Sequence, residues 1–226
     1  MSDPEAPALP WQPYPPLADE ERIVRAQAFA TRMAMRRSCR AFLSDPVPQG
    51  VIEAAIRAAG SAPSGANHQP WHFAVLSTPE AKAALRVAAE EEERRFYGGR
   101  AGEEWLRALA PLGTGPDKPY LEDAPWVIAA FAQRRGGLDP AAAAQNYYVL
   151  ESVCIACGLL LAALHEAGVA TLTHTPNPMK FLNRLCRRPD DERPVMLVIA
   201  GHAAPEAVIP EHAMRKKPLE QILSWL

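Results

Sequence analysis

Arginine is concentrated in one short run of the sequence, which makes that run a first candidate for chemistry. Arg36, Arg37 and Arg40 surround Ser38 and Cys39, and no acidic residue lies among them. Guanidinium groups bind phosphate oxygens in bidentate pairs, so the run is typical of an anion site. A solvated basic helix end, favoured by the helix macrodipole, explains it equally well. The residues alone leave both interpretations open.

A second candidate is the polar loop at residues 61–71, which precedes an apolar segment. Its centre, Ser64, Gly65 and Ala66, is small and exposes backbone N–H groups at close range. Such a loop suits a flat ligand or an oxyanion. An ordinary polar turn has the same composition and is commoner.

A third candidate is a group of two threonines and a histidine that follows an apolar segment. Thr173, His174 and Thr175 come at the end of a predicted strand and before Pro176. Polar groups at a strand end can point into a ligand crevice. Threonine at a strand end is more often structural, so this signal is weak alone.

Four consecutive glutamates at residues 90–93 precede a glycine-rich, charged segment that extends to residue 119. We expect residues 90–120 to form a mobile lid, because such covers are weakly packed. A site for a free amino acid needs one anion and one cation at matching separation, and this segment has acidic residues at its start and a lysine near its end. A run of glutamates is otherwise normally a solvated helix face.

Hydrophobic patterning indicates the elements that must position these groups. Helices are predicted at residues 20–35, 49–59, 79–95, 141–167 and 181–187, and strands at 71–77, 126–132, 169–173 and 195–200. Strands separated by long helices indicate a layered α/β or α+β architecture.

The first 18 residues contain six prolines and are predicted to be an extended arm rather than a helix or a central strand. Trp11 and Tyr14 in this arm favour docking on a partner. We expect one domain at residues 19–226.

Composition excludes several classes of protein. The chain has 24 Lys and Arg against 26 Asp and Glu, which argues against a nucleic-acid binder. No signal-peptide pattern is present, and the apolar run at 152–164 is predicted to be a buried helix rather than a membrane span. Scattered cysteines indicate neither a disulfide framework nor a metal site, and Cys154 and Cys157 are predicted to pack in the core. A cytoplasmic location fits these features.

Four motifs together carry a family resemblance: RRSCR at 36–40, APSGANHQPW at 62–71, THTP at 173–176 and RKKPL at 215–219. From about residue 32 onward, the sequence resembles the FMN-dependent nitroreductase superfamily. The EEEE run, Phe96-Tyr97, Trp105 and the KPYL motif at 118–121 are similar to its iodotyrosine deiodinase branch, which dehalogenates halotyrosines.

The resemblance implies an α+β, nitroreductase-like fold, with a mostly antiparallel central sheet flanked by helices, in an intertwined homodimer. It also implies an FMN site and a substrate site. The implied FMN-binding residues are Arg36, Arg37, Ser38, Cys39, Arg40, Ser64, Gly65, Thr173, His174, Thr175 and either Arg215 or Lys216. The implied substrate-binding residues are Ala66, through its N–H, and Glu93, Tyr97 and Lys118. Ser64 and Gly65 would touch the flavin of the partner subunit, and the Thr175 hydroxyl would reach flavin N5.

The implied reaction is reductive dehalogenation of a halogenated tyrosine. Because no G-x-G-x-x-G motif is present, electrons are expected from an external NAD(P)H-linked reductase or flavin reductant. Alternatives are a nitroreductase or quinone reductase acting on nitroaromatics, a flavin-fragmenting enzyme, and a flavin or amino-acid sensor without turnover. No membrane or nucleic-acid partner is expected.

Overall fold

The computed structural model of the chain describes residues 8–10, 15–139, 141 and 143–226. The chain divides into two compact units, Met1–Met35 and Arg36–Leu226. The first contains helix α1, Asp19–Met35, which buries none of its residues within its own unit. The interpretation of Trp11 and Tyr14 as docking residues falls outside the described positions.

The second unit is built on a four-stranded antiparallel sheet with the order β1-β2-β4-β3. The strands are β1 (Trp71–Leu76), β2 (Trp126–Ala132), β3 (Ala170–His174) and β4 (Arg193–Gly201). Strand β2 is almost wholly buried and is one of the two inner strands of the sheet. The α+β class and the antiparallel sheet predicted from the sequence are thereby confirmed.

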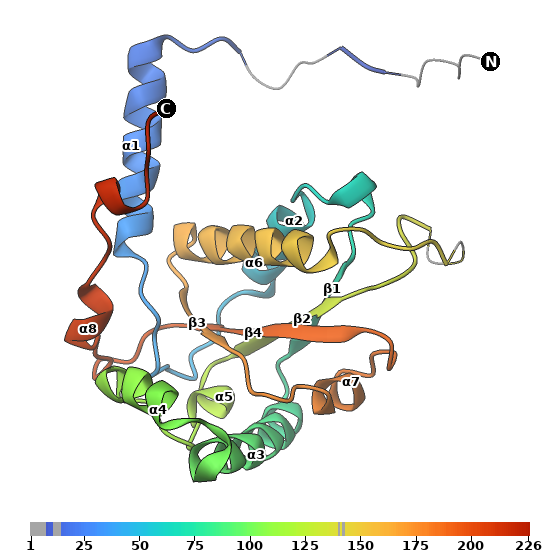
Figure 1. Cartoon of the computed structure of the whole chain (residues 1–226), viewed down its shortest axis with the longest axis vertical. Helices are drawn as coiled ribbons and strands as arrows, with labels where there is room; N and C mark the ends of the chain where they lie inside the picture. Colours follow the sequence, from blue (N-terminus) through green and yellow to red (C-terminus); the bar gives the residue numbers. More distant parts are fainter. Residues whose placement is uncertain (1–7, 11–14, 140, 142) are drawn as a thin grey trace. The chain divides into compact units, whose positions relative to one another are not determined.

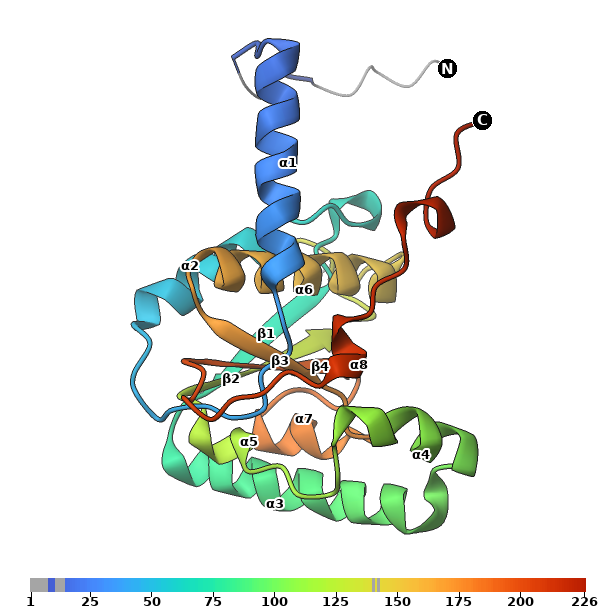
Figure 2. The same cartoon turned by 90° about the vertical axis from the view of Figure 1, so that its left-hand side faces the viewer.

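Helices cover both faces of the sheet (Figure 1). Helices α2 (Gln49–Gly60) and α6 (Val149–Glu166) pack on one face, around Ile128 and Val198. Helices α3 (Pro79–Arg95), α5 (Tyr120–Asp123) and α7 (Phe181–Leu185) pack on the other, around Phe131 and Ile199. Figure 2 shows α4 (Glu103–Leu109) in the same layer as α3. This second layer positions the predicted lid.

Five further short helical turns are described. Near the chain end are α8 (Glu211–Met214) and η5 (Leu219–Gln221). The others are η1 (Gly65–Asn67), η2 (Phe96–Arg100) and η3 (Ala110–Leu112).

The predicted helix at residues 141–167 begins too early. Helix α6 starts only at Val149, after Tyr148 adopts a left-handed conformation with φ 48°. The preceding segment is held against the end of β2, because the Asn146 side chain donates to the Gln133 carbonyl and accepts from the Gly137 N–H. These tertiary hydrogen bonds override a strongly helical, alanine-rich composition.

Helix α6 is, among the described residues, the one helix long and apolar enough to span a membrane by length and composition. One of its faces is buried, including Val153, Cys157 and Leu160, as expected for a core helix. Cys157 thus packs in the core as predicted, whereas the prediction is wrong for Cys154, which is exposed.

A close contact at Gly201 gives a test of the packing between β4 and its neighbours. A Cβ on Gly201 would lie 2.6 Å from Cδ of Pro125 and 3.2 Å from Cδ1 of Phe42. Because overpacking costs about 1–3 kcal/mol, we expect Gly201→Ala to lower the free energy of unfolding by about that amount. Gly50→Ala is the control, since nothing lies within 4 Å of its Cβ. Urea unfolding measures both; equal stability of the two variants would contradict the prediction.

Candidate active site

A cavity of about 450 Å³ lies between the end of β3 and the predicted lid. Residues from five separate chain segments line it, and seven of the predicted site residues are among them. These seven are Arg40, Glu93, Tyr97, Lys118, Thr173, His174 and Thr175. The fold therefore brings together one of the three arginines of the predicted anion site, the strand-end group and the charged lid residues.

A buried ion pair joins the two ends of the lid. Nζ of Lys118 lies 3.3 Å from Oε2 of Glu93, and the two side chains are only 4% and 11% exposed. The ammonium also donates to Thr114 Oγ1 at 3.2 Å and to the carbonyl of Gly115, and it lies 5.6 Å from the centre of the Tyr97 ring. Burial lowers the pKa of Lys118, and the Glu93 carboxylate opposes this shift. The pair gives the cavity one anion and one cation within a few ångströms.

The other glutamates of the 90–93 run have different surroundings. Glu91 is exposed and pairs with Arg95, as in a solvated helix face. Glu90 is buried, pairs with Arg86 at 2.7 Å and accepts the N–H of Lys118 at 2.8 Å. Although burial opposes it, these contacts hold the pKa of Glu90 below its ordinary value. Glu90 therefore anchors the backbone that carries the cavity cation.

The lid is folded in this structure. Helix α3 continues into a π-helical turn, in which Gly99 has φ 141°. The Phe96 ring meets the Trp105 ring edge to face at 5.3 Å, and both line the cavity. Arg100 pairs with Glu92 at 3.0 Å and donates to the carbonyl of Asn177, beyond β3. The aromatic residues thus provide an apolar wall, and Arg100 ties the lid to the loop after β3.

The arginine run is extended rather than helical, because α1 ends at Met35. Ser38 pairs with Thr171 in a parallel bridge, and the Cys39 N–H donates to the Thr171 carbonyl at 2.9 Å. This pairing places the run alongside β3. Arg36 and Arg40 have no carboxylate within ion-pair distance in the part of the chain that the structure describes. Arg40 therefore lines the cavity, and Arg36 precedes it in the same extended run, without an ion-pair partner among the described residues.

The side chain of Cys39 packs into the core. Its thiol is buried in the core and donates to the Ala41 carbonyl at 3.0 Å. Burial raises its pKa. Any contact of this residue with a cofactor would thus come from its backbone.

The strand-end residues point to different sides. Thr173 and Thr175 are exposed, whereas the His174 side chain is 9% exposed and lies 3.7 Å from Glu93. Alternation along a strand explains the difference. The imidazole therefore faces the Glu93 carboxylate of the lid, whereas the two threonine side chains are open to solvent.

The loop around Ser64, Gly65 and Ala66 does not line this cavity. It is tightly fixed, since Ser64 Oγ accepts the Gln69 N–H at 2.9 Å and a Cβ on Gly65 would lie 2.6 Å from the Tyr147 carbonyl oxygen. Ala66 is held at φ 51°, which is costly for an L-residue. Such strain in a well-fixed loop is typical of functional sites.

Arg215 and Lys216 are exposed and also lie outside the lid cavity. Arg215 follows α8 and lines a separate cavity with Glu211 and His212. Within one chain, the predicted site residues therefore do not all line the same cavity.

Sequence reasoning missed two arginines of the candidate site. Arg193 lines the cavity from β4, and Arg100 fastens its lid. A lone arginine directly after Gly98-Gly99 was the available signal for Arg100. No comparable pattern marks Arg193.

The buried imidazole makes the fold sensitive to acid. Burial, and then the Lys118 cation, lower the pKa of His174 to about 3 from an unfolded value of 6.5. Below pH 6.5 the unfolded chain binds a proton that the folded chain does not bind. The free energy of unfolding therefore decreases as the pH is lowered below 6.5, by up to about 1.4 kcal/mol per pH unit. We expect His174→Phe to show a shallower fall between pH 6.5 and 4.5 in denaturant titrations; equal slopes would contradict this.

Several known proteins are similar to this chain in sequence and in fold. The nitroreductase family model matches residues 33–202. An iodotyrosine deiodinase of Haliscomenobacter hydrossis is 46% identical over 198 residues, covering 88% of this chain and 89% of the relative. Iodotyrosine deiodinase 1 of Homo sapiens is 41% identical over 206 residues, covering 91% and 71%.

Solved structures give the same result. A structure of oxidized iodotyrosine deiodinase bound to FMN and 3-iodo-L-tyrosine matches with a TM-score of 0.68 and 27% identity, over 78% of this chain and 90% of that chain. A nitroreductase with bound FMN from Desulfitobacterium hafniense shares the fold, with a TM-score of 0.63 and 18% identity over 88% and 97%. The chain therefore belongs to the nitroreductase family, and within it to the iodotyrosine deiodinase branch.

Proposed function

We propose that this chain is an FMN-dependent enzyme that removes halide reductively from halogenated tyrosine. The observation that carries the proposal is the buried Glu93–Lys118 pair in a cavity that also contains Thr175. Relatives named iodotyrosine deiodinase, 40–46% identical, support the same reaction. The balanced reaction replaces halide by hydrogen on the ring and consumes two electrons and one proton.

The arginine run and the residues at the end of β3 fit FMN. Arg36 and Arg40 offer guanidinium groups without acidic partners among the described residues, as a phosphate requires. Thr173 and Thr175 present exposed hydroxyls at the end of the neighbouring strand. These arginines would hold the phosphate end, and the Thr175 hydroxyl would donate to the ring system. When bound, FMN supplies the electrons of the reaction.

The lid residues recognise the amino-acid end of the substrate. Glu93 accepts from the substrate ammonium, and Lys118 donates to the substrate carboxylate. The ion pair between the two residues is thus replaced by one ion pair of each residue with the ligand. Both contacts are strengthened because the side chains are buried. Tyr97, Phe96 and Trp105 exclude water from the ring of the substrate.

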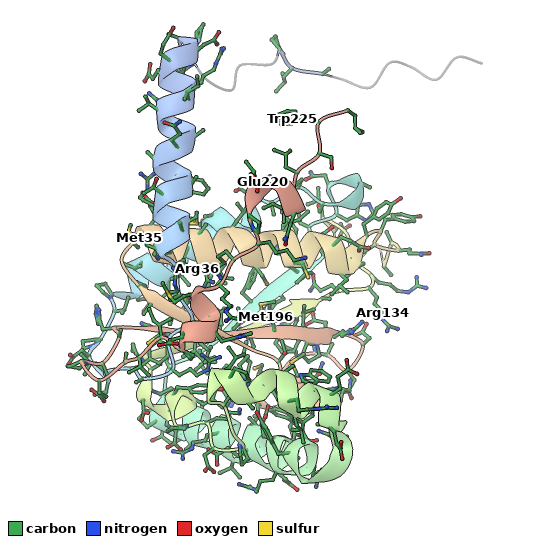
Figure 3. The ribbon with its side chains drawn as sticks, turned by 60° about the vertical axis from the view of Figure 1, so that its left-hand side comes forward. Met35, Arg36, Arg134, Met196, Glu220 and Trp225 are labelled. Carbon is green, nitrogen blue, oxygen red and sulfur yellow. The ribbon has the colours of Figure 1, made fainter. Side chains whose placement is uncertain are left out.

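A second copy of the chain would complete the site. The loop with Ala66 does not reach the lid cavity of its own chain, so its N–H would meet the phenolate oxygen in the partner's cavity. Apolar surface for an interface is abundant: the outer face of α6 exposes Ile155 and Leu159, and the C-terminal segment exposes Trp225 (89%). Figure 3 shows Trp225 beyond the level of α6, at the end of this segment. A symmetric homodimer satisfies both observations.

The decisive experiment is anaerobic reduction of the FMN-loaded protein followed by addition of 3-iodotyrosine. We expect reoxidation at 450 nm together with one iodide and one tyrosine per flavin. Reoxidation by 4-nitrophenol alone would identify a nitroreductase instead. Tight iodotyrosine binding without iodide release would identify a sensor. A cytoplasmic location and an external NAD(P)H-linked electron donor are parts of this proposal.

A further inference from the structure

The imidazole of His174 is a buried polar group with an unused ring nitrogen. Its side chain is 9% exposed, and Nε2 has no hydrogen-bond partner among the described residues. A phenyl or aliphatic side chain would fill the same position without burying a polar atom. Buried polar atoms without partners are rare in folded proteins and call for an explanation.

The unused nitrogen is directed at the lid carboxylate. Nε2 lies 3.7 Å from Oε1 of Glu93, whereas Lys118 Nζ contacts the other oxygen, Oε2, at 3.3 Å. The Tyr120 ring packs against the imidazole edge to face, at 5.9 Å and 81°. A hydrogen bond needs an approach of only a few tenths of an ångström more. Each oxygen of Glu93 therefore has its own neighbour, one cationic and one aromatic.

The imidazole stays neutral although a carboxylate faces it. The groups that face it are Lys118, Glu93 and Tyr120, and Arg40 and Tyr97 also line the cavity. The adjacent ammonium of Lys118 and burial both disfavour an imidazolium. A neutral imidazole can donate one hydrogen bond to a carboxylate while leaving its negative charge in place for an ammonium ligand.

We propose that His174 is a positioning residue for Glu93. When a substrate enters, its carboxylate draws Lys118 away from Glu93. Nε2–H of His174 then closes the gap to Oε1 and keeps the carboxylate oriented toward the substrate ammonium. This inference rests on the proposed function, because it assigns Glu93 to the ammonium of the ligand.

Ligand titrations of the FMN-loaded protein test this role. The ligands are 3-iodotyrosine and 2-iodophenol, which lacks the amino-acid group, and quenching of flavin fluorescence reports binding. We expect His174→Phe to weaken iodotyrosine binding about 10-fold or more and 2-iodophenol binding less than about twofold, since a hydrogen bond to a charged group is lost. His174→Gln carries an N–H donor at a similar reach and should stay within about threefold of the wild type.

Two results would overturn the assignment. One is an equal loss for both ligands in His174→Phe while FMN affinity and melting temperature are unchanged. The other is undiminished iodotyrosine binding in that variant. If the wild type fails to bind iodotyrosine, the proposed function fails separately. Long-range ¹H–¹⁵N correlation spectra of the wild type then still show which ring nitrogen of His174 carries the proton. A proton on Nε2 supports the role, and a proton on Nδ1 alone overturns it.

Discussion

Lys118→Ala is expected to lower kcat/KM for 3-iodotyrosine by about 100-fold to 1,000-fold while changing the turnover of 4-nitrophenol less than about threefold. Truncating one partner of a buried charge pair typically costs 2–5 kcal/mol. The nitrophenol has no carboxylate to be held, so its turnover does not need Lys118. Steady-state assays with chemically reduced protein measure both substrates.

Helix α3 carries both a lid glutamate and a matched control for it. Glu93→Gln should behave like Lys118→Ala, because the buried anion of the pair is removed. Glu91→Gln changes a neighbouring glutamate that is 56% exposed and pairs only at the surface, and should leave both activities unchanged. If Glu93→Gln and Glu91→Gln proved equivalent, or if nitrophenol turnover fell in parallel with dehalogenation, the lid would not recognise an amino acid.

The second large effect concerns cofactor binding. The double variant Arg36→Ala and Arg40→Ala should raise the Kd for FMN by about 100-fold or more, since each charge-assisted hydrogen bond contributes about 1.5–3 kcal/mol. Purified variant protein should be nearly colourless. Fluorescence titration of protein freed of flavin gives the Kd directly.

Arg57→Ala is the matched control for this variant. Arg57 is exposed on α2 and, among the described residues, forms an ion pair only with Glu53, at 3.6 Å. It should retain wild-type affinity for FMN. Wild-type affinity in the double variant would remove the arginine run from the cofactor site and leave it a solvated basic segment.

Local patterns predicted the regular elements well. Helix α3 has a Thr78 cap that accepts the Ala81 N–H, followed by Pro79, and its predicted bounds are the observed ones. Strand β2 is an unbroken apolar run and was predicted to the residue. These elements are specified by neighbours in the sequence, which is the information that pattern reasoning uses.

Features set by distant contacts were not predictable in this way. The start of α6 depends on Asn146 contacting Gln133, and the extended arginine run depends on Ser38 pairing with Thr171. The helical segments of the lid were obscured by glycines that serve as turns. Which of the four adjacent glutamates would line the cavity followed only from the resemblance, since spacing alone does not distinguish Glu93 from Glu91.

The mutual pairing of Glu93 and Lys118 has a consequence for how the protein responds to its medium. The pair carries no net charge before binding, and the zwitterionic amino-acid end of the ligand adds none, so this end leaves the long-range field around the cavity unchanged. At one pH, where the phenol charge is common to the ligands compared, ionic strength should then affect the binding of iodotyrosine less than that of analogues with a charged group of one sign at this end. Ligands with a single charge, such as an iodinated tyramine or an iodinated hydroxyphenylpropionate, would leave one buried ion uncompensated, and sodium chloride would shift their weak binding.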